Sequence, residues 1–186
     1  GQSLSEPDAA VAALLGGPPF FIDLTAFARD RALAAEAATG IVERLGLVRL
    51  NVGDAIFAVS AARWLAFRQA ILATLESFHA DNPDLPGLGR ERLRLQLQPR
   101  LPPPVFAVAL LSLAKEGEVG LDGAWVRLAS FVLRLTPLEE ELWVRLRPLL
   151  TGAGRFRPPR VRDIAEALDI AEQDVRHLLK LMGRLG

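Results

Sequence analysis

The residues in this chain whose types and spacing best suit chemistry are basic. Four arginines fall within eight positions, with an aromatic residue between the first two: Arg155, Arg157, Arg160 and Arg162. Guanidinium groups pair with phosphates, and an aromatic ring among them can stack on a base. Arg176 and Lys180, four residues apart on one side of the last helical segment, extend this candidate nucleic-acid contact. The alternative interpretation of the arginine cluster is a solvated loop that leads into a helix.

Neither histidine stands in a pattern typical of a catalytic or metal site. His79 closes a helix with no carboxylate or cysteine at ligand spacing, so we expect it to meet the helix dipole and bond the terminal carbonyls. His177 lies opposite the apolar residues of its helix, so we expect it in solvent or as part of a contact surface. The sequence has no cysteine, phosphate-binding glycine loop, nucleophile elbow or zinc-protease motif. We therefore expect no catalytic residue, cofactor or metal in this chain.

A group of carboxylates, Glu139, Glu140 and Glu141, follows Thr136. A threonine at the N-cap with a glutamate three residues later is a capping box, in which each residue satisfies an amide of the other. Negative charge also suits the first turn of a helix. These carboxylates are therefore interpreted as structural.

Glycines mark a repeat along the chain. Gly46, Gly117 and Gly186 each follow a helical segment and are roughly 70 residues apart, as expected for left-handed helix caps. Alternating strands follow the first two glycines: 47–50 and 55–59 around a bend at 51–54, then 118–121 and 124–128 around Asp122-Gly123. Such pairs around glycine and aspartate predict β-hairpins.

Helical segments precede each glycine. They are predicted over 24–29 and 32–45, with Asp23 as N-cap of the first, over 90–97 and 102–115, and over three segments in the last unit. Helices followed by a hairpin are the winged-helix order. The sequence predicts a mainly α fold with small β-hairpins (α+β), as tandem winged-helix modules in an elongated arrangement. The modules are 5–60, 61–134 and 135–186, the last truncated before its wing.

The core of the second module is predicted from apolar spacing along its long first helix and from its later elements. The expected members are Trp64, Phe67, Leu75, Phe78, Leu111, Val119 and Trp125.

Several segments resemble a known family. Residues 78–93 read FHADNPDLPGLGRERL: a histidine that closes a helix, then Asn-Pro, Pro-Gly-Leu and a new helical start. This run is similar to the second winged-helix module in the C-terminal arm of the bacterial selenocysteine-specific translation elongation factor (SelB). Residues 136–143, TPLEEELW, resemble the first helix of that arm's third module, and VRDIA at 161–165 with DVR at 174–176 resembles its next two helices. The resemblance extends from about residue 8 to residue 186.

The resemblance implies a function for a longer protein. In that family a GTPase domain that binds GTP and Mg precedes four winged-helix modules. The whole factor brings selenocysteinyl-tRNA to the ribosome, and its last module grips the mRNA selenocysteine insertion hairpin. This chain would then be a non-catalytic arm that links the GTPase and tRNA-binding part to the hairpin-binding module during UGA recoding. The six basic residues named above are its candidate contacts to RNA or ribosome, and the arm alone is expected to bind RNA weakly or not at all.

Composition fits that interpretation without requiring it. The chain has 22 basic and 22 acidic residues, so no net charge indicates a nucleic-acid partner. Its single methionine is Met182 and its first residue is Gly1, so we expect the chain to be a fragment of a longer protein. Short apolar runs and the absence of cysteine lead us to expect a cytoplasmic monomer with no membrane partner. Two alternatives stay open: a winged-helix DNA-binding transcriptional regulator and a structural tandem winged-helix scaffold. The apolar helix at 105–115 suits module packing more than base reading.

Overall fold

The computed structural model describes residues 4–150 and 160–185 and divides into two compact units. The first unit contains residues up to 79 together with 87–131, and the second contains 80–86 together with the residues from 132 onward. Each unit has its own core and is described by itself.

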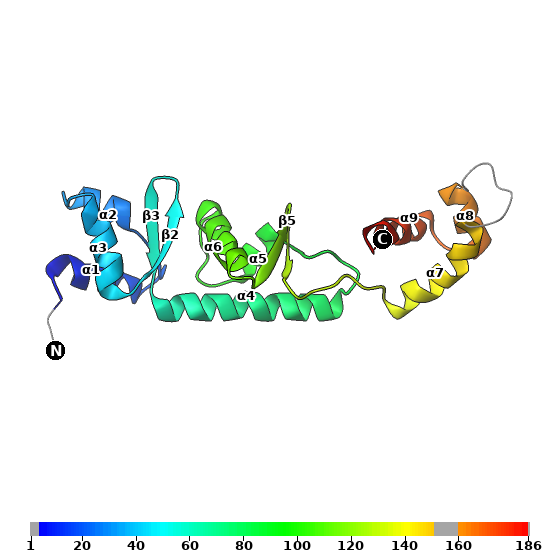
Figure 1. The fold of residues 1–186 in the computed structure, drawn as a ribbon, viewed down its shortest axis with the longest axis horizontal. Helices are drawn as coiled ribbons and strands as arrows, with labels where there is room; N and C mark the ends of the chain where they lie inside the picture. The colour runs from blue at the N-terminus through cyan, green and yellow to red at the C-terminus, as the bar shows by residue number, and fades with distance from the viewer. Residues whose placement is uncertain (1–3, 151–159, 186) are drawn as a thin grey trace. The chain divides into compact units, whose positions relative to one another are not determined.

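The first unit begins with a winged-helix order of elements (Figure 1). These elements are α1 (Glu6–Leu15), β1 (Ile22–Asp23), α2 (Leu24–Asp30), α3 (Glu36–Leu45), β2 (Val48–Val52) and β3 (Ala55–Val59). Asp23 caps α2 as expected, since its carboxylate accepts the Ala26 amide at 3.0 Å. The helix predicted over 32–45 begins only at Glu36, because Ala32 adopts a left-handed φ of 55° that a helix does not tolerate.

The same order then repeats. It consists of α4 (Ala61–Asp81), β4 (Leu88–Gly89), α5 (Arg90–Gln96), α6 (Pro103–Lys115), β5 (Val119–Asp122) and β6 (Trp125–Leu128). The last two residues of α4 belong to the second unit. Gly46 and Gly117 both have positive φ after a helix, which confirms their predicted capping role, whereas Gly186 lies outside the described residues.

Each repeat carries a three-stranded antiparallel sheet, in the order β1-β3-β2 and then β4-β6-β5. The turns of the two hairpins differ from those predicted: the first is tighter, and the second is shifted by one residue. Val52 pairs with Ala55 and Asp122 pairs with Trp125, so the turns are Gly53-Asp54 and Gly123-Ala124. The sequence did not indicate β1 and β4, because two residues are too short to show an alternating pattern.

The core of the second repeat extends into the first. Val105, Phe106 and Leu110 of α6 are buried in one cluster with Phe67 of α4 and with Leu50 of β2. The β2 strand belongs to the first repeat, so its hairpin packs against α6 of the second. The two repeats are therefore joined by one apolar cluster, and the first repeat also has a cluster of its own.

The predicted core of the second repeat is partly correct. Phe67, Leu75 and Val119 are buried, and Trp64 and Phe78 pack against the same cluster. Two members were wrong: Leu111 is 52% exposed and Trp125 is 43% exposed.

The residues next to Trp125 and Leu111 show which sides of β6 and α6 face the core. The next residue on β6, Val126, is fully buried in place of Trp125. Cross-strand partners lie on the same side of a hairpin, and Leu121 pairs with Val126, so Val126 lies on the side of Val119 and Trp125 lies on the opposite side. Leu111 lies next to the buried Leu110 on α6, on the helix surface that faces away from the core.

The second unit contains α7 (Pro137–Leu150), α8 (Val161–Leu168) and α9 (Glu172–Leu185) around a core that includes Leu146, Ile164 and Leu178. The predicted capping box at the start of α7 is confirmed. The Thr136 amide donates to Glu139 Oε1 at 2.8 Å, and the Glu139 amide donates to Thr136 Oγ1 at 3.2 Å. None of the helices formed by residues 4–150 and 160–185 is long and apolar enough to cross a membrane.

The described residues form three apolar core clusters. One lies in the first repeat, one in the second and one in the helices of the second unit. The fold is α+β with small antiparallel sheets, as predicted. The predicted module boundaries at residues 60 and 134 stay a prediction, because nearly all residues of the first two modules pack into one compact unit.

Candidate nucleic-acid interface

The candidate contact residues of the third module come from two helices. Arg155 and Arg157 lie outside the described residues. Arg160 immediately precedes α8 and makes no side-chain cap bond, and Arg162 lies in the first turn; both are exposed. A basic side chain gains nothing from the positive end of the helix dipole. The exposed guanidinium groups of Arg160 and Arg162 are therefore suited to an external anion.

The α9 helix carries the other candidates. Arg176 and Lys180 are both exposed on it, and Arg176 pairs with Glu172 at 3.1 Å. An exposed ion pair at this spacing contributes little free energy, so a phosphate can displace it. Arg184 continues the same four-residue spacing and is also exposed. The sequence analysis missed Arg184, although the spacing of Arg176 and Lys180 was the signal that could have found it.

The core of the second unit holds α8 and α9 side by side. Ile164 of α8 and Val175 of α9 are both buried in it. Asp169 ends α8 in a left-handed conformation with a φ of 55°, and Arg145 donates to the Leu168 carbonyl at 2.8 Å. This arrangement is a helix-turn-helix with an exposed, charged second helix, the geometry that winged-helix proteins use to contact nucleic acid.

The equivalent helix of the second module has a different surface. Lys115 is the only charged residue of α6, whose sequence is PPVFAVALLSLAK. Its apolar side is buried in the core that includes Leu50 of β2. A helix covered by a neighbouring hairpin cannot enter a DNA groove without separating the two modules.

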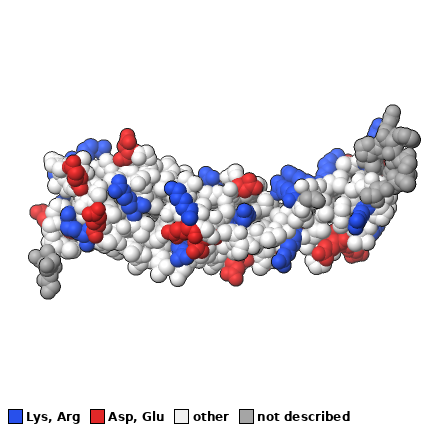
Figure 2. All heavy atoms as spheres, viewed as in Figure 1, with Lys and Arg blue, Asp and Glu red and all other residues white. Residues whose placement is uncertain are grey.

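Charge elsewhere is mixed. Lys and Arg side chains alternate with Asp and Glu on the face shown in Figure 2, with no large area of one sign among the described residues. Such a surface does not by itself attract a polyanion strongly.

The wing of the second module presents a smaller surface that the sequence analysis did not identify. Trp125 lies exposed on β6 beside an open depression that Arg90 and Arg92 also line. Arg90 donates to the Gly123 carbonyl at 3.1 Å, which holds it at the hairpin turn. An exposed indole with nearby guanidinium groups can stack on a base. Sequence reasoning missed this surface because it placed Trp125 in the core.

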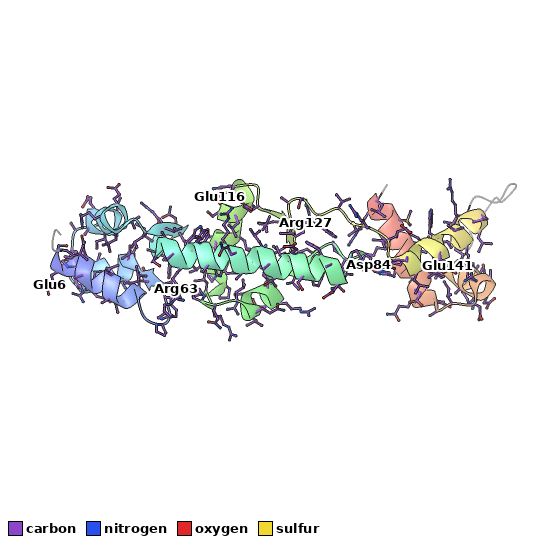
Figure 3. All side chains as sticks on the ribbon, turned by 90° about the horizontal axis from the view of Figure 1, so that it is seen from below. Glu6, Arg63, Asp84, Glu116, Arg127 and Glu141 are labelled. Carbon is purple, nitrogen blue, oxygen red and sulfur yellow. The ribbon has the colours of Figure 1, made fainter. Side chains whose placement is uncertain are left out.

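His79 has a structural role, as expected, but a different one. It is buried, its ring stacks on Phe131 with centroids 3.7 Å apart, and Nε2 accepts the Leu128 amide at 3.1 Å. Burial, and then the positive charge of Arg127 (labelled in Figure 3), lower the pKa of His79. The expected structural role is therefore confirmed, but Nε2 binds the β6 backbone and not the carbonyls that end the helix.

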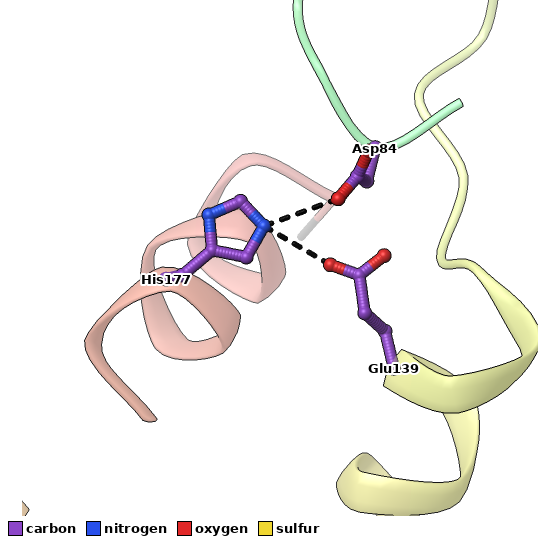
Figure 4. A group of neighbouring side chains, drawn as sticks. All are labelled: Asp84, Glu139 and His177. Carbon is purple, nitrogen blue, oxygen red and sulfur yellow. Dashed lines mark hydrogen bonds and ion pairs between the residues drawn. The ribbon is translucent and has the colours of Figure 1, made fainter. Parts of the chain in front are cut away.

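His177 is exposed, as expected, and it also has partners that the sequence did not indicate. Its Nε2 lies 3.0 Å from Glu139 Oε2 and 3.2 Å from Asp84 Oδ2, and its side chain is 45% exposed (Figure 4). The three residues come from segments far apart in the sequence, so no local spacing could reveal them. All three belong to the second unit.

A further ion pair stabilises the first module. The carboxylate of Asp8 on α1 is buried and accepts two hydrogen bonds from Arg44 of α3, at 2.7 and 3.0 Å. The Arg44 hydrogen bond is the main cause that lowers the pKa of Asp8. The structure therefore assigns this pair to α1–α3 packing, not to a ligand site.

Comparison with known proteins agrees with the geometry. Residues 72–128 match the family model described as elongation factor SelB, winged helix. The selenocysteine-specific elongation factor of Escherichia coli (strain K12) is 26% identical over 165 residues, which cover 89% of this chain. The chain spans 26% of the length of that relative. Residues 72–128, with the covered helix α6 and the three-stranded wing, are similar to a winged-helix domain of SelB.

Proposed function

We propose that this chain is the winged-helix arm of a selenocysteine-specific translation elongation factor, and that it acts as a non-catalytic spacer. In this proposal the arm separates a GTPase part, which holds GTP, Mg and selenocysteinyl-tRNA, from a module that grips the mRNA insertion hairpin on the ribosome. The catalytic chemistry belongs to the GTPase part. The arm sets the distance between the two.

The observation that carries the proposal is the contact between α6 and β2. Leu50 is 1% exposed and shares a core with Phe106 and Leu110. This contact places the hairpin of one module on the helix that would otherwise read nucleic acid. Two modules joined in this way resist bending, which a spacer requires.

The α4 helix supports the same function. It runs for 21 residues, about 30 Å at the usual rise of an α-helix. Phe67, Ile71 and Leu75 hold one side of it in the core of the second module. A long helix that is packed against a core bends little, as a spacer requires.

The alternative of a DNA-binding transcriptional regulator is less well supported. Such a protein needs a free, polar recognition helix. The α6 helix is apolar and covered, and α3 exposes the acidic residues Glu36 and Glu43. The alternative of a tandem scaffold shares the packing with our proposal and differs only in its partners.

A chimeric factor tests the proposal. In Escherichia coli, the region of the endogenous factor that aligns with this chain is replaced by this chain, and selenocysteine incorporation at a reporter UGA codon is measured. We expect incorporation well above that of a strain without the factor. A chimera with a Gly/Ser linker of equal length is the control, and we expect it to fail because it cannot hold the spacing. Equal incorporation by the two chimeras would contradict the spacer role.

A gel-shift comparison tests the spacer against the alternative of a DNA-binding transcriptional regulator. The chain is mixed with duplex DNA or with a UGA-hairpin RNA at two salt concentrations. Weak, salt-sensitive binding to both is expected for a spacer. Tight, sequence-specific binding to DNA would support the regulator instead.

A further inference from the structure

Three potential metal ligands meet in the second unit, outside the candidate nucleic-acid interface. Asp84 lies in the turn after α4, Glu139 in the first turn of α7, and His177 in α9. His177 Nε2, Asp84 Oδ2 and a Glu139 oxygen all lie within 4.8 Å of one another (Figure 4). One imidazole and two carboxylates from three segments thus point at a common centre.

We propose that Asp84, Glu139 and His177 bind a divalent transition-metal ion of the Zn²⁺ type. Imidazole nitrogen and carboxylate oxygen are both established Zn²⁺ ligands. Mg²⁺ and Ca²⁺ prefer sites made only of oxygen, so the histidine selects against them. The ion joins the turn at residues 82–86 to α7 and α9 through these three ligands.

Two separations between ligand atoms match those of a tetrahedral coordination shell. Zn²⁺ binds nitrogen and oxygen at about 2.0–2.2 Å, so neighbouring ligands in a tetrahedron are about 3.3 Å apart. The two distances from His177 Nε2, 3.0 Å to Glu139 and 3.2 Å to Asp84, are close to that value. A neutral imidazole carries one proton at most on this nitrogen, and one N–H can point directly at only one carboxylate. A metal ion satisfies both carboxylates at once.

The first two ligands are held in place by neighbouring hydrogen bonds. Glu139 Oε1 accepts the Thr136 amide at 2.8 Å, which leaves Oε2 directed at His177. The Arg134 amide donates to the Pro83 carbonyl at 2.8 Å and fixes the turn that carries Asp84. Supporting contacts of this kind orient ligands and raise metal affinity. The side chains of Glu139 and Asp84 are only 11% and 20% exposed.

The third ligand leaves the site accessible. The His177 side chain is 45% exposed, while its neighbours Val175 and Leu178 anchor α9 in the core. Three protein ligands leave a fourth position for water, as in open zinc sites. Competing ligands are few, since the chain has no cysteine and one other histidine, the buried His79.

Calorimetry and Co²⁺ absorption on the full 186-residue chain test the proposal. We expect one Zn²⁺ per chain, and d–d absorption bands when Co²⁺ is added. His177→Gln, Glu139→Gln and Asp84→Asn should each weaken Zn²⁺ binding by more than about 10-fold, since removing even a supporting contact costs that much. Glu139→Gln keeps the capping box, because glutamine serves that position as well as glutamate does. Circular dichroism checks that each variant remains folded.

Glu140→Gln is the matched control, since Glu140 is exposed on the same helix turn and is not one of the three ligands. It should bind Zn²⁺ like the parent chain, and millimolar Mg²⁺ should not compete. Three results would overturn the proposal: no Zn²⁺ binding, equal binding by His177→Gln, or an equal loss in Glu140→Gln. Each would leave the cluster as an ion pair only.

Discussion

The α6 and α9 helices are each the third helix of a predicted module, and they have different surfaces. Five residues of α6 are buried, and its one charged residue is Lys115 at the end. Three residues of α9 are buried, and its exposed positions include Arg176, Lys180 and Arg184. An apolar helix at this position suits contact between modules, whereas a charged one suits an outside partner.

The largest expected effect is the disruption of the shared core around α6. Phe106 is 1% exposed and meets Phe67 edge-to-face at a centroid distance of 6.2 Å. Phe106→Ala should lower the free energy of unfolding by about 3–5 kcal/mol. Leu111→Ala, on the exposed side of the same helix, should change it by less than about 0.5 kcal/mol. Urea denaturation measures both, and similar decreases in the two variants would contradict the assigned faces of α6.

Gly87 and Gly183 differ in the space around their Cα atoms, so alanine should have opposite effects at the two positions. A Cβ on Gly87 would lie 2.5 Å from the Val126 carbonyl oxygen, so Gly87→Ala should destabilise the first unit by about 1–3 kcal/mol. Gly183 in α9 has no heavy atom within 4 Å of such a Cβ. Gly183→Ala should stabilise the second unit by about 0.5–1 kcal/mol, because alanine favours the helix. Thermal melts of both variants test this prediction. A change in melting temperature of the same sign in both variants would contradict it.

The sequence predicted elements well where the signal was local. The glycine caps at Gly46 and Gly117 and the capping box at Thr136 depend on neighbouring residues, and the structure confirms all three. The strand β4 depends on pairing with a distant strand, and the side of β6 on which Trp125 lies depends on its partners across the hairpin. Trp125 pairs with Asp122, whereas the buried Val126 pairs with Leu121.

The candidate site shows the same division between local and distant signals. The basic stripe of α9 follows helical spacing, so sequence analysis found two of its members. The contact between His177 and Glu139 joins residues 38 positions apart, and it exists only because α9 folds back on α7. Helical spacing could place His177 opposite the core, but it could not show what lies there.

Acid pH should weaken the first unit through His79. Burial lowers the pKa of His79 in the folded chain, so below its ordinary value of about 6.5 the unfolded chain takes up the proton first. Stability is therefore complete above pH 6.5 and falls below it, by up to about 1.4 kcal/mol per pH unit, until the folded histidine is protonated. Urea denaturation between pH 7.5 and 5.0 measures the slope.

A non-titrating variant isolates this effect. The amide oxygen of His79→Gln can still accept the Leu128 amide, so the variant should fold with lower stability at pH 7.5 and a flatter pH dependence. An unchanged slope would assign the acid sensitivity to other groups. Asp8 is not one of them in this pH range, because its pKa is lowered and its contribution disappears only as the pH falls below about 3.8.

Trp125 should matter little for stability despite its size. It is 43% exposed on β6, so Trp125→Ala should cost no more than about 1 kcal/mol, in contrast with Phe106→Ala. A decrease near that of Phe106→Ala in the same urea assay would indicate that the indole is buried and that the pairing of Asp122 with Trp125 is wrong.

The smallest effect is expected for RNA binding by α9. Arg176→Gln with Lys180→Gln should reduce the affinity of the chain for a hairpin RNA only a few-fold, because the chain alone binds weakly. The slope of log affinity against log salt should fall by about 0.7–0.9 for each phosphate that the variant no longer neutralises. A loop-scrambled hairpin should bind equally, since phosphate contacts carry no base information. Lys115→Gln at the end of α6 is the matched control and should leave both quantities unchanged, because α6 serves the module contact. An equal reduction in affinity from Lys115→Gln would mean that α6, too, faces RNA, and the contrast between the two helices would not hold.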